Sequence, residues 1–321
     1  MEMHKKIRDI SSKKLTCIIP AYNEHDNLEL SISRVEKKLA SFSKNYEIII
    51  VDDGSTDGTH AYLREVTRTS LHIKSIHFSR NFGKEYALSA GIDYATGDVC
   101  FIIDADLQNP IDLFDRFVEE WSFGLDMVYG YKSSRPDEGW LKVFLTKIYY
   151  LIFKAYNPKI HINAQDFRLM DKVVIKQLQL FREKSRFMKG LFSWVGFNVK
   201  GIPFQMEPRL HGKTKFNFKR LLKLALDGLF SFSPNVLSSV SVLGLLVAFL
   251  SFTWGWVLFI ERIFFGVDVA GFATLAVGMF FLGGVQLFSL GVIGEYISRI
   301  FNETKNRPLY IISEKYNLND L

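Results

Sequence analysis

Two long stretches without a charged residue lie in the last third of the chain, at residues 228–260 and 269–294. A helix needs about 20 apolar residues to cross the hydrocarbon core of a bilayer. Buried helices of soluble proteins are rarely so long and so free of charge. We therefore expect two membrane-spanning helices, near residues 236–260 and 272–294. The polar N-terminus, MEMHKKIRDISSKK, predicts no signal peptide.

Lysine and arginine residues predict the orientation of these two helices. Basic residues precede the first stretch, from Lys213 to Lys223, and follow the second, from Arg299 to Lys315. The short connection between the stretches, residues 261–268, holds one arginine and two acidic residues. Because cytoplasmic loops carry an excess of Lys and Arg, we expect both termini and the domain before the first span to be cytoplasmic.

The chain is thus predicted to have three parts: a cytoplasmic domain (1–227), a two-helix transmembrane domain (228–298) and a cytoplasmic tail (299–321). Two segments of the first part, residues 140–156 and 216–230, are aromatic and aliphatic with scattered basic residues. Such helices lie naturally at the surface of an anionic membrane. We expect interfacial helices there, although burial of their apolar faces in the domain core is the other interpretation.

Positive charge is concentrated beside the first span. Residues 182–227 contain eleven Lys and Arg and three acidic residues, a net charge of +8, whereas the whole chain carries +6. Nucleic acid is one class of partner for such a segment. Anionic membrane lipids and phosphorylated substrates explain it better, because the segment leads directly into a membrane span. We expect membrane lipids as partners and no nucleic acid.

The first part of the chain alternates short β-rich runs with helical patterns. We expect strands at residues 15–19, 47–51, 73–78, 99–103 and 127–131, and helices at residues 26–41, 59–69, 84–95 and 112–121. This rhythm predicts a mostly parallel sheet with helices on both faces, and ligands of such sheets bind beyond the carboxyl ends of the strands. The two cysteines, Cys17 and Cys100, fall inside strands and are expected to be buried and reduced.

Polar motifs follow the first three expected strands. Pro20-Ala21-Tyr22-Asn23-Glu24 comes after the first, and a run from Asp52 and Asp53 to Thr59 comes after the second. Acids at strand ends can bind a ribose hydroxyl or a base N–H, so the pair favours a nucleotide pocket, although the second motif alone is equally typical of an ordinary turn. Ser79-Arg80-Asn81-Phe82-Gly83-Lys84 could place backbone N–H groups and a cation near phosphates, or be a loop with a solvated lysine.

The fourth expected strand runs into Asp104-Ala105-Asp106-Leu107-Gln108. Residues two apart on an extended strand project to the same side, so the two carboxylates would repel one another unless a cation lay between them. Carboxylate and carbonyl oxygens are the ligands that Mg2+ and Mn2+ prefer, and these ions usually bridge to substrate phosphates. We expect Asp104, Asp106 and Gln108 to bind Mg2+ or Mn2+.

Together these motifs carry a family resemblance. I-P-A-Y-N-E, V-D-D-G-S-T-D-G-T, S-R-N-F-G-K-E and D-A-D-L-Q-N-P, in this order, resemble glycosyltransferase family 2. The later motifs D-F-R-L-M (from Asp166), R-F-M-K-G-L, W-V-G and R-x-x-G-x-T-K, followed by two expected spans, resemble the polyprenyl-phosphate glycosyltransferases, among them dolichyl-phosphate mannose synthase and the bactoprenol glucosyltransferases of O-antigen modification. The resemblance implies an α/β, Rossmann-like GT-A domain followed by interfacial helices and two C-terminal transmembrane helices.

The resemblance also implies site residues. Asp166 matches the proposed catalytic carboxylate of the family. Residues expected to bind the nucleotide sugar are Pro20, Tyr22, Glu24, Asp52, Asp53, Lys84, Asp104, Ala105, Asp106, Arg209 and Lys215. Residues expected to bind the lipid phosphate are Lys132, Ser134 and Arg135. Two positions depart from the family pattern: Gln165 stands where glycine is usual, and Lys132 stands where arginine is frequent, which replaces a bidentate phosphate donor by a point charge.

The implied reaction is inverting transfer of a hexose from a nucleotide sugar to polyprenyl phosphate. UDP-glucose and undecaprenyl phosphate are the expected pair, and UDP-N-acetylglucosamine or the donor of another hexose is the alternative. The resemblance places it in the bacterial inner membrane and suggests a homo-oligomer, a tetramer in relatives. It also suggests a flippase and a downstream membrane glycosyltransferase as partners.

Three other functions remain open from the sequence. A processive polysaccharide synthase should carry Q-x-x-R-W, whereas the nearest stretch here reads Glu183-Lys184-Ser185-Arg186-Phe187. A glycolipid synthase would use another lipid acceptor. An inactive membrane scaffold should have lost its carboxylates, whereas Asp104, Asp106 and Asp166 are present.

Overall fold

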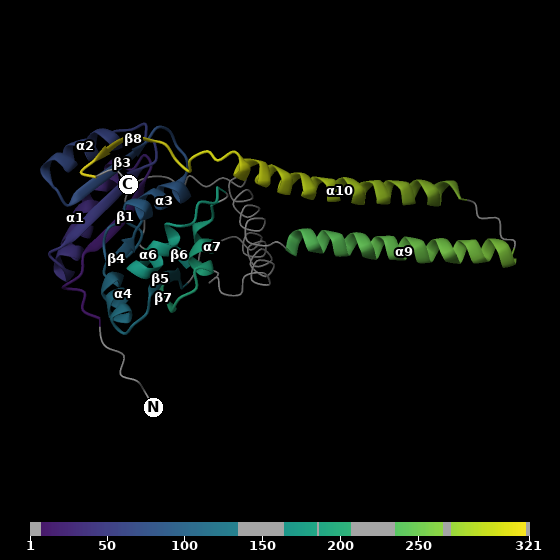
Figure 1. The fold of residues 1–321 in the computed structure, drawn as a ribbon, viewed down its shortest axis with the longest axis horizontal. Helices are drawn as coiled ribbons and strands as arrows, with labels where there is room; N and C mark the ends of the chain where they lie inside the picture. Colours follow the sequence, from purple (N-terminus) through teal and green to yellow (C-terminus); the bar gives the residue numbers. More distant parts are fainter. Residues whose placement is uncertain (1–7, 134–163, 185, 207–234, 266–270, 319–321) are drawn as a thin grey trace, which may run out of the picture. The chain divides into compact units, whose positions relative to one another are not determined.

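The computed structural model describes residues 8–133, 164–184, 186–206, 235–265 and 271–318 (Figure 1). The chain divides into two compact units: one comprises Met1–Leu222 and Arg307–Leu321, and the other comprises Lys223–Asn306. The chain therefore leaves the first unit, forms the second, and returns to the first.

A mixed sheet is the framework of the first unit. Its strands are β1 (Leu15–Ala21), β2 (Tyr46–Asp52), β3 (Ile73–Phe78), β4 (Val99–Ile102), β5 (Met127–Lys132), β6 (Ala164–Asp171), β7 (Val199–Phe204) and β8 (Ile312–Tyr316). Among the described residues the strand order is β7-β5-β6-β4-β1-β2-β3-β8. The helices of this unit are α1 (His25–Phe42), α2 (Thr59–Thr69), α3 (Lys84–Tyr94), α4 (Leu113–Ser122), α6 (Lys172–Leu178) and α7 (Met188–Trp194).

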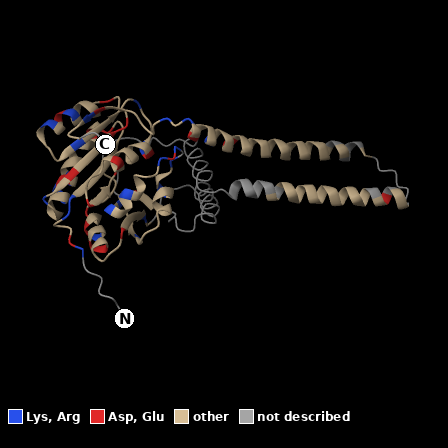
Figure 2. Cartoon of the chain, viewed as in Figure 1, with Lys and Arg blue, Asp and Glu red and all other residues tan. Residues whose placement is uncertain are grey.

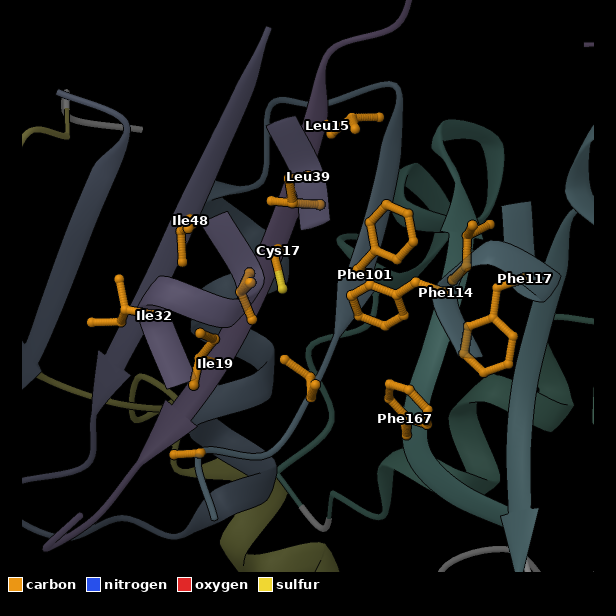
Figure 3. Close-up of a cluster of buried hydrophobic side chains, with 14 of the residues drawn as sticks. Leu15, Cys17, Ile19, Ile32, Leu39, Ile48, Phe101, Phe114, Phe117 and Phe167 are labelled. Atoms are coloured by element: carbon orange, nitrogen blue, oxygen red, sulfur yellow. The ribbon is translucent and has the colours of Figure 1, made fainter. Parts of the chain in front are cut away.

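Alternating apolar residues on the strands give the sheet two buried faces. On β2, Ile48 and Ile50 belong to a large cluster that includes residues of α1, α2 and α4, and Figure 3 shows part of this cluster. Ile49 and Val51 point to the other face, where they pack against α3. Strands buried on both faces must be apolar at nearly every position, which explains the continuous run Ile48–Val51.

Most of the expected elements are confirmed, usually within one or two residues of the predicted ends. Cys17 and Cys100 are buried and free, as expected. The expectation of a mostly parallel sheet is wrong in part, because β6 runs antiparallel to both β4 and β5. Four elements that follow the last predicted strand were not expected: β6, β7, α6 and α7.

The C-terminal residues differ from the predicted tail. Strand β8 pairs antiparallel with β3, so residues expected to form a simple tail instead complete an edge of the sheet. Two side chains reinforce this return. The hydroxyl of Tyr310 donates a hydrogen bond to Asp93 on α3 at 2.7 Å, and the side-chain amide of Asn317 donates to the carbonyl oxygens of Thr67, Ser70 and Ile73.

The second unit contains two long apolar helices, α9 (Asn235–Phe265) and α10 (Phe272–Thr304), which contact one another. Figure 2 shows that they carry few charged residues. Within the described part of the chain, one stretch is long and apolar enough to cross a membrane, Val277–Thr304 of α10, whereas α9 contains the shorter apolar stretch Gly244–Leu258. The structure thus has one candidate span where the sequence predicted two.

The candidate span also starts and ends later than the predicted residues 272–294. The expected interfacial helices, residues 140–156 and 216–230, lie outside the described residues.

A buried carboxylate holds the amino-terminal ends of the central strands together. Glu47 of β2 is 1% exposed. Its carboxylate accepts hydrogen bonds from the Thr16 hydroxyl at 2.6 Å, the Thr96 backbone N–H at 2.9 Å and the Lys74 ammonium at 2.7 Å. Burial opposes ionisation, but these hydrogen bonds, with that from Lys74 the strongest, bring the pKa of Glu47 down to about 2. We therefore assign Glu47 a structural role, in which its charge holds neighbouring strands together.

We predict that Glu47→Gln destabilises the protein by roughly 2–4 kcal/mol at pH 7, because Lys74 loses its buried partner. A pKa lowered on folding gives stability that is full above the ordinary value of 4.5 and is lost as the pH falls toward 2. Thermal unfolding of the full chain in detergent, measured from pH 7 to pH 3, checks this. The unfolding temperature of Glu47→Gln should depend less on pH than that of the unaltered protein. Glu65→Gln, at an exposed residue, is the control and should keep the pH dependence of the unaltered protein. Equal pH dependence of both variants would contradict the assignment.

Candidate active site

The polar motifs gather at one edge of the sheet. The parallel pairing of β1, β2, β3 and β4 brings their carboxyl ends together, and the register places Ala21 beside Asp52 and Asp52 beside His77. Lys132 ends β5, which pairs with β6 beside Ala164. The strand ends predicted to form the site therefore meet, as the βα rhythm indicated.

The loops after β1 and β2 are interlocked. The Asn23 backbone N–H donates to the Ser55 hydroxyl at 2.9 Å, and the Asn23 side-chain oxygen accepts from the Thr56 backbone N–H at 2.8 Å. Asn23 has a positive φ of 54°, which asparagine adopts more readily than most residues. Nearby, Pro20 is buried and Tyr22 is exposed. These two hydrogen bonds tie the loops after β1 and β2 together.

Asp52 is engaged by the protein itself. One carboxylate oxygen accepts from the Ser55 backbone N–H, and the other lies 3.0 Å from His77 Nδ1. The other ring nitrogen of His77 lies 2.9 Å from the Ser75 hydroxyl. Burial opposes ionisation of Asp52, but the bonds from His77 and Ser55 lower its pKa. Its predicted contact with a nucleoside stays a prediction.

Asp52, His60 and His77 place their ligand atoms within 4.8 Å of one another, so they form a candidate metal-binding group. The rings of His60 and His77 are stacked, with centroids 4.1 Å apart and an angle of 26° between their planes. The nitrogen lone pairs of stacked imidazoles lie in two nearly parallel planes, whereas a metal ion needs lone pairs that converge on one point. The donor set at Asp104 is the better candidate for a divalent cation.

Asp53 holds the loop that leads into α3. Its carboxylate accepts hydrogen bonds from the backbone N–H groups of Phe82 at 2.7 Å and Gly83 at 2.9 Å, and from the Asn81 side chain at 3.0 Å. Burial raises the pKa of Asp53 to about 6, although these backbone bonds favour the charged form. Because Lys84 is the first residue of α3, Asp53 determines where the Lys84 side chain begins.

The Asp104–Gln108 motif lies in a turn, because β4 ends at Ile102 and Leu107 has a positive φ of 59°. The expectation that it lies on an extended strand is therefore wrong. The alternation of exposure survives, however: Asp104, Asp106 and Gln108 are half-buried, whereas Ala105 and Leu107 are buried. Each of the three oxygen-bearing side chains predicted to bind a cation is therefore partly exposed.

Strand β6 brings Asp166 to this motif. Because β6 is antiparallel to β4, its beginning lies beside the end of β4, and the register places Arg168 opposite Ile102. Asp104 is two residues beyond Ile102, and Asp166 is two residues before Arg168. Asp104 and Asp166 are 62 residues apart in sequence but are neighbours in the fold. No local sequence pattern around Asp166 indicates this.

Lys84 connects the two carboxylates. Its ammonium lies 2.6 Å from Asp104 Oδ1 and 3.0 Å from Asp166 Oδ2. The other oxygen of Asp166, Oδ1, is buried and has no hydrogen-bond partner among the described residues. Burial opposes ionisation of Asp166, but the charges of Lys84, Lys189 and Arg168 hold its pKa well below the ordinary value. Asp166 thus has one carboxylate oxygen that the described residues leave without a hydrogen bond.

Three further charged residues surround Asp166, and the sequence analysis did not assign them a role. Arg168 is buried, with its guanidinium 3.4 Å above the centre of the Phe192 ring. Glu85 accepts a hydrogen bond from the Met188 backbone N–H at 2.6 Å, and burial together with the Asp166 charge raises its pKa to about 7. Burial lowers the pKa of Lys189. For Arg168 the available signal was a charged residue within the apolar run Phe167–Met170.

Several predicted site residues lie outside the described residues: Ser134, Arg135, Arg209 and Lys215. Among the predicted residues that the structure describes, it brings Lys84, Asp104 and Asp166 into direct contact.

The residues at this edge fit a divalent cation. Asp104 and Asp106 offer carboxylate oxygens and Gln108 an amide oxygen, which is the chemistry that Mg2+ and Mn2+ prefer. The geometry already favours positive charge there, because the Lys84 ammonium lies against Asp104. A buried oxygen of Asp166 without a partner adds further demand for a donor or a cation.

Comparison with known proteins identifies the family. The profile of glycosyl transferase family 2 matches residues 16–179. The chain belongs to glycosyltransferase family 2. Its mixed sheet with helices on both faces is the GT-A, Rossmann-like arrangement predicted from the sequence. This glycosyltransferase carries the matched motifs at the carboxyl edge of that sheet.

Curated relatives match nearly the whole glycosyltransferase. An uncharacterized glycosyltransferase of Synechocystis sp. is 46% identical over 95% of this chain and 96% of its own length. A prophage bactoprenol glucosyl transferase homolog of Escherichia coli is 39% identical over 93% of this chain and 98% of its own. The bactoprenol glucosyl transferase of Shigella phage SfX is 39% identical over 94% and 99%. This chain is therefore an enzyme of the same family as the bactoprenol glucosyl transferases.

Gly54 tests the close approach of the loop after β2 to the loop after β3. It has a φ of +67°, and an added Cβ would lie 2.4 Å from the Arg80 carbonyl carbon. We predict that Gly54→Ala destabilises the protein by roughly 2 kcal/mol or more and speeds hydrogen exchange at residues 79–84. Gly58→Ala is the matched control, since its φ is −72° and the nearest neighbour of an added Cβ would be the His25 side chain, at 3.0 Å. Equal exchange in both variants would show that the close approach is unimportant.

Proposed function

We propose that this enzyme transfers glucose from UDP-glucose to undecaprenyl phosphate, with inversion at the anomeric carbon, on the cytoplasmic face of the bacterial inner membrane. The contact of Lys84 with Asp104 and Asp166 carries the proposal, because it joins a candidate cation site to a carboxylate with one oxygen that has no hydrogen-bond partner among the described residues. Relatives named as bactoprenol glucosyl transferases, 39% identical over most of the chain, support this choice of donor and acceptor.

The leaving group is a nucleoside diphosphate. Asp104, Asp106 and Gln108 would hold Mg2+ or Mn2+, which when bound offsets the negative charge that grows on the departing diphosphate. Lys84 stands beside this position and contributes a further positive charge. We propose that the nucleotide is bound by Pro20, Tyr22, Glu24, Asp52, Asp53 and Ala105. Arg209 and Lys215 would close over the diphosphate.

The nucleophile is a phosphate oxygen of the lipid. Its second pKa of about 6 leaves it largely ionised at neutral pH, so the attack on the anomeric carbon needs no strong base. Asp166 fits this requirement, because a carboxylate whose pKa lies below the ordinary value is a poor proton acceptor but a good hydrogen-bond acceptor. We propose that Asp166 Oδ1 accepts a hydrogen bond from a hydroxyl of the sugar and so orients it, while Lys132, Ser134 and Arg135 bind the lipid phosphate.

Assay of the full chain with defined substrates tests this function. The protein in detergent is given undecaprenyl phosphate with UDP-glucose, UDP-N-acetylglucosamine or GDP-mannose, and lipid products are identified by mass spectrometry. We expect a hexosyl-phosphate lipid with UDP-glucose and a loss of at least about a hundredfold in Asp106→Ala. Asp112→Ala, at an exposed acid that pairs with Lys38, is the control. Transfer to diacylglycerol, or full activity of Asp106→Ala in EDTA, would contradict the proposal.

We further propose that both α9 and α10 cross the membrane, with the termini cytoplasmic and residues 261–268 outside. Tetramer formation, a flippase and a downstream glycosyltransferase remain predictions from the family resemblance. The apolar composition of α9 and α10 and the basic residues that flank them support the two-span arrangement.

Cysteine labelling tests the two-span arrangement. The native Cys17 and Cys100 are buried, so the folded protein has a low background. We expect Glu261→Cys to react with a membrane-impermeant maleimide in intact cells, because the end of α9 lies outside in this arrangement. Lys305→Cys, at an exposed residue just after α10, should react only after permeabilisation. Labelling of Glu261→Cys only after permeabilisation would show that α9 does not cross.

A further inference from the structure

A positive charge already occupies the place where a cation is needed. The Lys84 ammonium lies 2.6 Å from Asp104 and 3.0 Å from Asp166. With two carboxylates this close, the ammonium keeps its positive charge. The two carboxylates would repel one another without it.

We propose that Lys84 is the resting counterion of Asp104 and competes there with the divalent cation until a nucleoside diphosphate draws Lys84 away. This inference rests on the proposed function, because it assumes that Asp104 takes part in binding the cation and the donor. It assigns Lys84 a coupling role: the residue makes binding of the cation and binding of the diphosphate depend on one another.

The competition follows from charge and distance. An ammonium 2.6 Å from Asp104 Oδ1 and a divalent cation on the same carboxylate repel strongly at such short range. A diphosphate supplies new acceptors for the ammonium. Once Lys84 bonds to the diphosphate, Asp104 is released to the cation. The cation and the diphosphate therefore bind more tightly together than the direct bond between them explains, and the coupling is reciprocal.

The lysine is also the part of this contact that is free to move. Its side chain is 43% exposed, whereas the side chain of Asp166 is 9% exposed and that of Asp104 is 27% exposed. The backbone at the start of α3 is fixed, because Gly83 donates to the Asp53 carboxylate. Release of Asp104 therefore needs only rotation of the long Lys84 side chain, and it leaves the loop in place.

Lys189 provides a matched comparison. Its charge acts on Asp166, Lys84 and Glu85, but no ion pair between Lys189 and Asp104 occurs among the described contacts. Loss of Lys189 removes the same unit of charge from the same cluster without removing a competitor from Asp104. A general electrostatic effect would appear in both lysine variants, whereas direct competition would appear only at Lys84.

The test measures Mn2+ binding without turnover. Free Mn2+ is followed by electron paramagnetic resonance in titrations of the full chain in detergent, with and without UDP. We expect Mn2+ alone to bind about tenfold more tightly to Lys84→Met than to the unaltered protein, and UDP to improve that affinity much less in the variant. The Mn2+ affinity of Lys189→Met should stay within about threefold of that of the unaltered protein. Lys84→Arg keeps the charge, so its Mn2+ affinity should resemble that of the unaltered protein.

Equal Mn2+ affinity in Lys84→Met and the unaltered protein would overturn the inference, as would equal gains in both lysine variants. If Lys84→Met misfolds, Lys84→Gln replaces it in the test, because the glutamine amide removes the charge but can still donate hydrogen bonds to the carboxylates. Circular dichroism checks the fold of each variant. Failure of the inference alone leaves glucosyl transfer to undecaprenyl phosphate intact. Failure of the proposed function appears instead as no lipid-linked hexose from any donor in the unaltered protein.

Discussion

The buried carboxylate of Asp53 organises the site more than any other group. It accepts hydrogen bonds from the backbone of Phe82 and Gly83, and so joins the end of β2 to the start of α3. An ionised acid in a buried position is unfavourable unless several donors surround it, which is why the loop must close on it. The position of Lys84, and through it the contact with Asp104 and Asp166, depends on that closure.

Carboxylates at the two ends of the sheet differ in how completely the protein satisfies them. Glu47 at the amino-terminal end is bonded by Thr16, Thr96 and Lys74. Asp166 at the carboxyl end has one oxygen held by Lys84 and one buried oxygen without a partner in the described part of the chain. A buried oxygen left unsatisfied costs free energy. We propose that a ligand supplies the missing hydrogen bond of Asp166, whereas Glu47 needs none.

The first unit contains residues from before and after the two apolar helices in the sequence. Residues after α10 return to pair with β3, and Tyr310 bonds to Asp93 on α3, the helix that begins with Lys84. The Tyr310 ring also stacks on Phe78, 5.0 Å away between centroids. A chain cut before Arg307 would lose β8 and these contacts. The apolar helices are therefore an insertion within the unit that does the chemistry, rather than an appendage after it.

The sequence alone determined the features that depend on local patterns. Apolar runs and strand-end acids predicted β1 to β5, the helices between them and the edge where Asp53, Lys84 and Asp104 lie, because these signals are short-range. Only the tertiary structure decided the pairing of β6 beside β4, the return of β8 to β3 and the bridge from Lys84 to Asp166. These contacts join residues far apart in the chain, through antiparallel pairing that the βα rhythm does not indicate. Long-range strand pairing reflects packing and charge in the folded chain, and no local pattern carries that information.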